Sequence, residues 1–266
     1  MESYGEYTVR GKTYRYKKFL KISTNSEAYF IGYMACDGGY LNGKHPRMRV
    51  NSTERYIMED FRDEFCPDST IYKGRFNSSK KVKATNAVYE LGLSSKLRTS
   101  LNNFGVFCYK KERRVVGIPN KFFLPYLAGV IDADGFIAVG HRKDCRTPRL
   151  RFFVTHQSGN YLSDLQKKMV DLYGLPTFVA YHHHTDCYRL SCQHTSKNIV
   201  FLRGILPFLK NRKKIKILSD YLNQYDVPQI SGELRETYKA IRSQVAQHDS
   251  TPAQKVQRLD GEYHEQ

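Results

Sequence analysis

Two short stretches that end in Asp-Gly carry residue types suited to metal chemistry. Residues 30–38 read Phe-Ile-Gly-Tyr-Met-Ala-Cys-Asp-Gly, and residues 127–135 read Leu-Ala-Gly-Val-Ile-Asp-Ala-Asp-Gly. When aligned, they share Gly at the third place, a small residue at the seventh, and Asp-Gly at the end. Carboxylates bind hard divalent cations, and cations held against phosphate oxygens suit phosphodiester hydrolysis. One Asp-Gly indicates only a helix end, but two in register favour a paired acidic site of Asp37 and Asp134.

Each stretch is expected to be a helix with an edge of small residues. Gly32 and Cys36 stand at i, i+4, as do Gly129 and Ala133. Two such edges allow helix backbones to approach closely, so the two aspartates would emerge side by side. Cys36 and Ala133, which precede the aspartates, are counted with them as candidate positions of the metal site.

The same plan of elements surrounds both stretches. Thr24 and Glu27 have capping-box spacing at the start of the first helix, and Asn120 is expected to cap the second helix after Pro119. Each helix is expected to stop at its Asp-Gly. Two strands, an amphipathic helix, two strands and a helix then follow in each copy. In the first copy these six elements are expected at 39–44, 47–52, 53–65, 70–76, 82–91 and 94–104. In the second copy they are expected at 136–142, 149–156, 160–173, 177–183, 186–193 and 196–209. The order αββαββα occurs twice, and further helices are expected at 211–225 and about 231–247.

The charge of the chain favours a polyanionic partner. The 266 residues include 43 Lys and Arg against 26 Asp and Glu, a net charge of +17. Residues 1–120 hold 22 basic and 12 acidic residues, residues 121–230 hold 16 and 8, and the last 36 hold 5 and 6. Two similarly basic halves suggest two units that face one long ligand, with nucleic acid first and an anionic membrane surface second.

Other compositional features exclude some classes of protein. No run approaches the roughly 18–20 apolar residues of a membrane span, and the N-terminus shows no apolar segment typical of a secretory signal. Six cysteines without a CxxC pair indicate reduced thiols. An intracellular protein is therefore expected.

Residues 127–135 resemble the signature of the LAGLIDADG homing endonucleases and differ from the name-giving string only at Val130. The resemblance extends over about residues 24–225, including Ile118-Pro119 and the stretch 206–210. It implies an α+β fold of two pseudo-symmetric αββαββα subdomains, each with a concave antiparallel sheet on the DNA major groove, packed through the two motif helices. It also implies that Asp37 and Asp134 are essential metal ligands.

The first copy departs from the second at the sixth place of the motif, with Ala35 in place of Asp132. That place is usually outside the metal set, so Asp132 is expected to be structural. The expected organisation is an N-terminal extension (1–23), a first subdomain (24–112), a linker (113–120), a second subdomain (121–228) and a C-terminal helical tail (229–266).

The resemblance implies two further kinds of catalytic residue. A polar residue after the second strand organises water near the metal ions, and it maps to His156 or Gln157 in the second copy and to Ser52 or Thr53 in the first. A basic residue after the last helix steadies the phosphate. It maps to Arg212, flanked by Lys210, Lys213 and Lys214, and in the first copy to Lys110 or Lys111. The alternative for the run 210–216 is a solvated helix start.

Basic and histidine side chains on the expected strands are candidates for DNA contacts, because alternate residues of a strand share one face. They are Arg47, Arg49, Lys73, Arg75, Lys81, Lys83, Arg142, Arg149, Arg151, His182, His184 and Arg189. A zinc site among His182, His183, His184, Cys187, Cys192 and His194 is disfavoured, since the short paired ligand spacing of structural zinc sites is missing.

The leading function is a site-specific double-strand DNA endonuclease. It is expected to act as a monomer without an obligate protein partner, on a long asymmetric duplex site, leaving short 3′ overhangs. Two or three Mg2+ ions, or Mn2+ in their place, are the expected cofactors. A non-cleaving binder on the same scaffold, either an RNA maturase or a transcription regulator, is the alternative. An intein needs a nucleophile at its first residue and a His-Asn-type end. An intein-associated nuclease is set aside, because the chain starts Met1-Glu2-Ser3 and ends His264-Glu265-Gln266.

Overall fold

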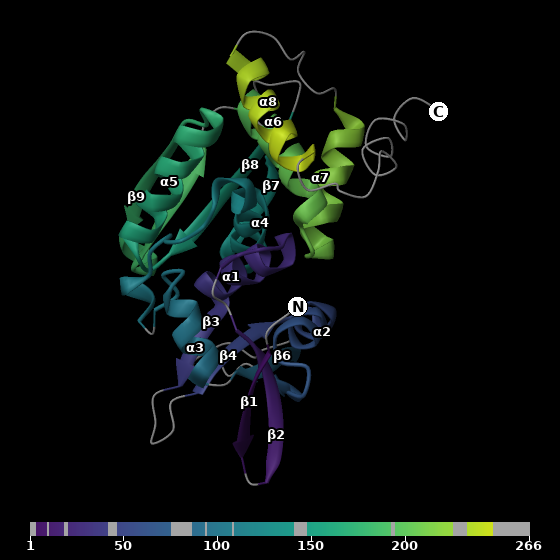
Figure 1. Ribbon diagram of the computed structural model, residues 1–266. Helices are drawn as coiled ribbons and strands as arrows, with labels where there is room; N and C mark the ends of the chain where they lie inside the picture. Colours follow the sequence, from purple (N-terminus) through teal and green to yellow (C-terminus); the bar gives the residue numbers. More distant parts are fainter. Residues whose placement is uncertain are drawn as a thin grey trace.

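The computed structural model contains a four-stranded antiparallel sheet in each half of the chain (Figure 1), and the two sheets have the same strand order. The order is β3-β4-β6-β5 in the first sheet and β7-β8-β10-β9 in the second. The structure describes residues 4–9, 11–18, 21–41, 47–75, 87–93, 95–107, 109–140, 148–192, 195–225 and 233–246.

Each sheet belongs to an αββαββα unit, which confirms the expected fold class. The first unit consists of α1 (Asn25–Asp37), β3 (Gly38–Leu41), β4 (Arg47–Ser52), α2 (Arg55–Phe65), β5 (Ile71–Arg75), β6 (Ala87–Leu93) and α3 (Ser95–Asn102). The second consists of α4 (Phe123–Asp134), β7 (Gly135–Gly140), β8 (Arg149–His156), α5 (Gly159–Tyr173), β9 (Thr177–His182), β10 (Cys187–Cys192) and α6 (Thr195–Ile205). Short 3₁₀ turns lie at Lys110–Glu112 (η1), Asn120–Phe122 (η2), His183–Thr185 (η3) and Leu206–Phe208 (η4).

The motif helices α1 and α4 lie side by side between the two units (Figure 1). Every residue from Ala28 to Cys36 is buried, as is every residue from Phe123 to Asp132. A helix that is apolar around its whole circumference must be covered on all sides. These two helices therefore form the centre of the hydrophobic core and join the units.

Each sheet has one face covered by helices and one face open. Along β8, Leu150, Phe152 and Val154 are buried, while Arg149 and Arg151 point to the other side. The ring of Phe152 stacks on Phe201 of α6, 5.5 Å between centroids. The alternation of a half-buried strand thus places the arginines on the face that α5 and α6 leave open.

The expected start of α1 is confirmed, whereas the start of α4 and the end of α6 differ from expectation. Thr24 caps α1 in the predicted capping box with Glu27. Asn120 does not cap α4, because the 3₁₀ turn η2 comes first and the Asn120 side chain accepts a hydrogen bond from Lys168 Nζ (3.1 Å) instead. Helix α6 ends at Ile205 and not at 209, since Pro207 lacks the amide donor that a continuing α-helix needs.

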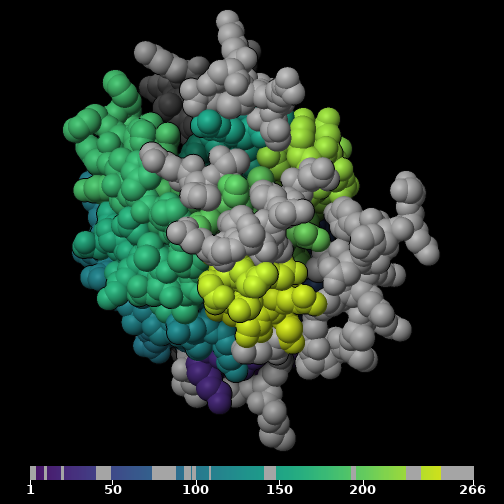
Figure 2. Space-filling view, turned by 90° about the horizontal axis from the view of Figure 1, so that it is seen from above, coloured from purple at the N-terminus to yellow at the C-terminus, as the bar shows by residue number. Residues whose placement is uncertain are grey.

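Elements outside the two units pack against them. A hairpin of β1 (Tyr4–Val9) and β2 (Lys12–Lys17), which the sequence did not indicate, is tied to the first unit by a two-bond Arg15–Asp68 ion pair. Helix α7 (Arg212–Gln224) follows η4, and α8 (Glu233–Ala246) covers α5 and α6 (Figure 2). The hydroxyl of Thr237 on α8 donates to the Tyr173 carbonyl at 2.7 Å.

None of the helices in the described residue ranges is both long enough and apolar enough to span a lipid bilayer.

Candidate active site

The two glycines of the motif let the backbones of α1 and α4 touch. A Cβ atom on Gly32 would lie 2.0 Å from the Tyr126 carbonyl oxygen, and one on Gly129 would lie 1.9 Å from that of Tyr29. No side chain of any kind fits in either place. Because both helices end at their aspartates, this close crossing brings Asp37 and Asp134 into one site.

The environment of the two carboxylates disfavours the state in which both are ionised. Removal from water, and then the charge of Asp134, raise the pKa of Asp37 to about 7. Burial also raises the pKa of Asp134. Two nearby carboxylates in a poorly hydrated site favour either a shared proton or a bound cation. The oxygen donors that the pair offers are those that hard divalent cations prefer.

Two lysines lie close enough to act electrostatically on both acids. The charges of Lys110 on η1 and Lys214 on α7 oppose the pKa rise of Asp37 and Asp134. Lys214 Nζ also donates to the carbonyl oxygens of Ile131 (2.5 Å) and Asp132 (2.8 Å) at the end of α4. Lys111, the alternative to Lys110, points to Asp186 instead, at 3.7 Å.

Arg212, the expected basic residue of the second copy, lies elsewhere. Its guanidinium covers the ring of Tyr56 (4.5 Å to the centroid), and its backbone amide donates to the Tyr56 hydroxyl. Lys210 pairs with Asp60 at 2.6 Å, and Lys213 is exposed. Position 212 therefore joins α7 to α2, and the basic side chain at the acid pair is Lys214, two residues further along α7. Helical periodicity explains the shift, since only one face of α7 meets α4.

Arg113 is a site residue that the sequence did not reveal. It falls in the stretch expected to be a linker, yet it is fully buried. Its guanidinium donates to the carbonyl oxygens of Ala35 (2.7 Å), Gly38 (2.6 Å) and Phe107 (3.2 Å). It thus satisfies the free carbonyls at the end of α1 and adds positive charge beside the acids. No local pattern distinguishes it from its neighbour Arg114, which is exposed.

His156 has a structural environment. Its Nδ1 accepts from the Ser158 amide (3.0 Å), so Nε2 carries the proton and donates to the Ala35 carbonyl of the other unit (3.1 Å). Burial, followed by the charge of Arg113, lowers the pKa of His156 to about 4. Both nitrogens are engaged by backbone groups, which leaves the neutral ring no free position for water. The equivalent Ser52 similarly accepts from the Glu54 amide at 3.0 Å.

Gln157, the alternative to His156, is exposed. It borders a surface hollow of about 680 Å3 together with Lys111, Gln166 and Tyr188. Thr53, the alternative to Ser52, is also exposed. Of the polar residues expected after the second strands, the exposed Gln157 and Thr53 have side chains accessible to water.

The Asp132 side chain joins α4 to α1 and to the start of α7 through hydrogen bonds, which is a structural role as expected. Its Oδ2 accepts from the backbone amides of Lys210 (2.6 Å) and Asn211 (3.0 Å) and from the Tyr29 hydroxyl (2.8 Å). Since Tyr29 is on α1, this carboxylate links both motif helices to the start of α7. Burial raises its pKa despite these three donors.

Cys36 and Ala133 offer no side-chain ligand. The Cys36 thiol is fully buried, and burial raises its pKa well above the ordinary value, so it stays protonated. Ala133 packs against the hydrophobic core. Across the described ranges no group of three or more His, Cys, Asp and Glu side chains is placed to hold a metal ion. A cation at the acid pair would complete its coordination with oxygens from backbone, water or phosphate.

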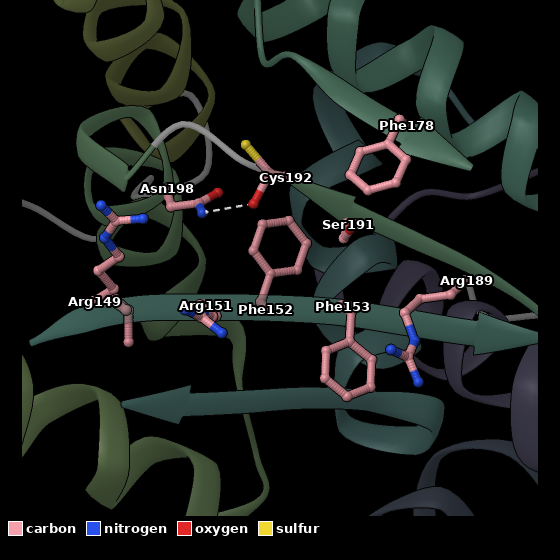
Figure 3. Close-up of a pocket in the computed structure, with 10 residues that line it drawn as sticks. Arg149, Arg151, Phe152, Phe153, Phe178, Arg189, Ser191, Cys192 and Asn198 are labelled. Atoms are coloured by element: carbon pink, nitrogen blue, oxygen red, sulfur yellow. Dashed lines mark hydrogen bonds between the residues drawn. The ribbon is translucent and has the colours of Figure 1, made fainter. Parts of the chain in front are cut away.

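The open face of the second sheet brings several expected DNA-contacting residues together. Arg149, Arg151 and Arg189 line a hollow of about 520 Å3 on the sheet (Figure 3). His182, at the end of β9, is half-buried and His184, in η3, is exposed. On the first sheet, Arg49 forms a 3.0 Å ion pair with Glu90 of the neighbouring strand, and Lys73 is exposed.

Arg47 lies in β4 and Arg75 in β5, at the strand ends. Lys81, Lys83 and Arg142 lie outside the described residues, as does His194 of the disfavoured zinc cluster.

No protein-family profile and no curated protein matches the sequence. Among solved structures, mesophilic variants of the homing endonuclease I-DmoI align at 15% identity and a TM-score of 0.47, over 74% of this chain and 97% of that one. The homing endonuclease I-WcaI, bound to its DNA recognition sequence, aligns at 13% identity and a TM-score of 0.49, over 74% of this chain and 87% of that one. Full-length WhiA from Thermatoga maritima aligns at 11% identity and a TM-score of 0.48, over 86% of this chain and 69% of that one.

Proposed function

We propose that the chain is a site-specific double-stranded DNA endonuclease that uses divalent cations bound between Asp37 and Asp134. The observation that carries the proposal is the meeting of two in-register carboxylates at the joined helix ends, with Lys110 and Lys214 beside them. A cation relieves the repulsion and desolvation that raise the pKa of Asp37. Mg2+ suits this oxygen donor set, and Mn2+ is the expected substitute.

Each group of the site has a separate part in the reaction, in which water hydrolyses one phosphodiester bond of each strand. Bound cations would supply activation of water and stabilisation of the charge that gathers on the phosphate. Asp37 and Asp134 would hold them. Lys110 and Lys214 would offset the negative charge of the incoming phosphate and of the transition state, which pre-placed positive groups stabilise best. Arg113 and Asp132 would keep the helix ends in position.

Two open sheet faces in one chain suit a long duplex. Positive side chains on the open faces would bind phosphates, and arginines can pair with guanine in the major groove. Because the two faces carry different residues, they cannot read both halves of a palindrome equally well, and the target is expected to be asymmetric. One chain holds both acids, so a monomer would suffice. Short 3′ overhangs follow from the resemblance of residues 127–135 to the LAGLIDADG signature.

A selection from a randomised duplex library tests the proposal. The full-length chain is incubated with the library either in Mg2+ or in a chelator, and retained and cut duplexes are sequenced separately. The expected result is a shared long sequence among retained duplexes in both conditions and among cut duplexes in Mg2+ only. Selective retention without cutting in Mg2+ or Mn2+ would contradict the nuclease and favour a non-cleaving DNA binder. Failure to retain any DNA would contradict both.

A further inference from the structure

Aromatic side chains are exposed on the open face of the second sheet. Phe136 of β7 pairs in register with Phe153 of β8, and their rings stack with centroids 4.9 Å apart. Phe178 of β9 lies on the same face, opposite Ser191 of β10. Phe136 is 51% exposed and Phe178 is 40% exposed. We refer to Phe136, Phe153 and Phe178 as the aromatic patch.

The surroundings of the aromatic patch are positively charged. The Arg189 guanidinium lies 4.4 Å over the ring of Phe153 (Figure 3), and its Nε is buried without a hydrogen-bond partner among the described residues. Arg149 and Arg151 line the same hollow. The four strands of the sheet contain no Asp or Glu. An apolar surface framed by arginines and free of carboxylates complements an anionic partner that also carries apolar groups.

The first sheet has no such surface at the matching positions. The residues paired after each Asp-Gly are Gly39 with Arg49 in the first sheet and Phe136 with Phe153 in the second. Two residues beyond Arg49 in β4, Asn51 pairs with Glu90 of β6. At the matching place in the second sheet, two residues beyond Phe153 in β8, Thr155 pairs with Arg189 of β10. A charged pair with a glycine beside it therefore replaces the aromatic rings. The patch is a property of the second unit and not of the fold.

The apolar group that DNA displays in the major groove is the 5-methyl group of thymine, and phenylalanine can cover it. We propose that the aromatic patch selects thymine within the half of the DNA site bound by the second unit. The inference rests on the proposed DNA-binding function and does not depend on cleavage. Arg149, Arg151 and Arg189 would hold the duplex against the patch through phosphates or guanines.

Uracil substitution tests the inference, because uracil differs from thymine only in lacking the methyl group. The library selection is carried out once with thymine and once with uracil in its place, using the full-length chain. In the selected duplex, thymines are then replaced singly by uracil. Each covered methyl group should contribute about fourfold in Kd, the usual effect of burying one such group. These positions should cluster in one half of the site.

Variants connect the effect to the patch. Phe136→Ala and Phe178→Ala should reduce the thymine-to-uracil ratio of Kd towards one at these positions, while their melting temperatures stay close to that of the unaltered chain. Tyr72→Ala is the matched control, because Tyr72 is 63% exposed on the first sheet. It should leave the ratio unchanged.

The possible failures are distinguishable. Sequence-selective binding with equal Kd for thymine and uracil duplexes overturns the inference and leaves the proposed nuclease standing. A methyl effect without cleavage supports the inference and contradicts the nuclease. An equal loss of the ratio in Tyr72→Ala assigns the effect to another surface and overturns the inference. A failure to retain DNA from both libraries also overturns it.

Discussion

The ends of the two motif helices show how two copies of one fold have come to differ. Both helices stop at an aspartate, but Arg113 satisfies the last carbonyls of α1 and Lys214 those of α4. Behind them, the first copy has the apolar Ala35, whose carbonyl also accepts from His156, while the second has the buried carboxylate of Asp132. The acids are equivalent, but the groups that hold them in place are not. Their roles can therefore be separated by mutation.

The acids themselves are expected to show the largest effect and no asymmetry. Asp37→Asn and Asp134→Asn should each lower double-strand cleavage by at least roughly a thousandfold, since each removes a ligand charge from the proposed cation site. DNA binding should persist, as measured by gel shift beside single-turnover cleavage. Asp220→Asn, a change of an exposed acid on α7, is the control. Double-strand cleavage at the original rate in either active-site variant would refute the assignment.

Arg113 should matter most for folding. Arg113→Met removes the guanidinium donors to the buried carbonyls of Ala35, Gly38 and Phe107 and leaves Ala35 with only the His156 donor among the described residues, so the free energy of unfolding should fall by about 3 kcal/mol. The neighbouring Arg114 is exposed and pairs with Asp164 at 2.7 Å, and Arg114→Met should change little. Urea unfolding of both variants measures the difference. Equal losses would mean that Arg113 has no special role at the end of α1.

Of the two basic residues at the helix ends, Lys214 should matter more for the reaction. Lys214→Met removes a positive charge beside both acids, and cleavage should slow by roughly a hundredfold. Lys213→Met, one residue away but exposed, should cleave at nearly the original rate. Single-turnover assays at saturating enzyme separate this loss from weaker binding. If the Lys213 variant is the slower one, α7 meets the acid pair through a different face.

The pH dependence of stability should show the smallest effect. Without divalent cations, folding binds a proton to Asp37, because its pKa is about 7 in the folded chain and near 4 in the unfolded one. Stability should therefore fall as pH rises from about 4 to about 7. Relative to Asp37→Asn, the fall should be on the order of 2 kcal/mol and should shrink when Mg2+ is added. A difference that does not change with pH would show that the pKa of Asp37 is not raised in the folded chain.

His156 acts in the opposite direction over part of this range. Its pKa is about 4 in the folded chain, below the ordinary value of roughly 6.5, so its contribution to stability is lost as pH falls below about 6.5. Both chains in the comparison contain His156, and its effect cancels in their difference.

Features that depend on neighbours in the chain were predictable. The Asp-Gly ends of both motif helices, the Thr24 cap, the order of helices and strands along the chain and the inward face of β8 all follow from residue spacing. The glycines at positions 32 and 129 also indicated the close crossing, because small residues at one helix edge have few other uses. The site positions that depend only on this crossing, Asp37 and Asp134, could therefore be located without a structure.

Features that depend on distant partners were not predictable. Arg113 and Arg114 are adjacent and chemically identical, and only the position of α1 decides which of them is buried. Lys214 and not Arg212 reaches the acids because of how α7 rotates against α4, and His156 is closed off because the Ala35 carbonyl of the other unit lies within 3.1 Å. The aromatic patch likewise exists only because strand register aligns Phe136 with Phe153. Local sequence determines where the two aspartates lie. Long-range packing decides which basic side chains lie beside them and which residues form the aromatic patch.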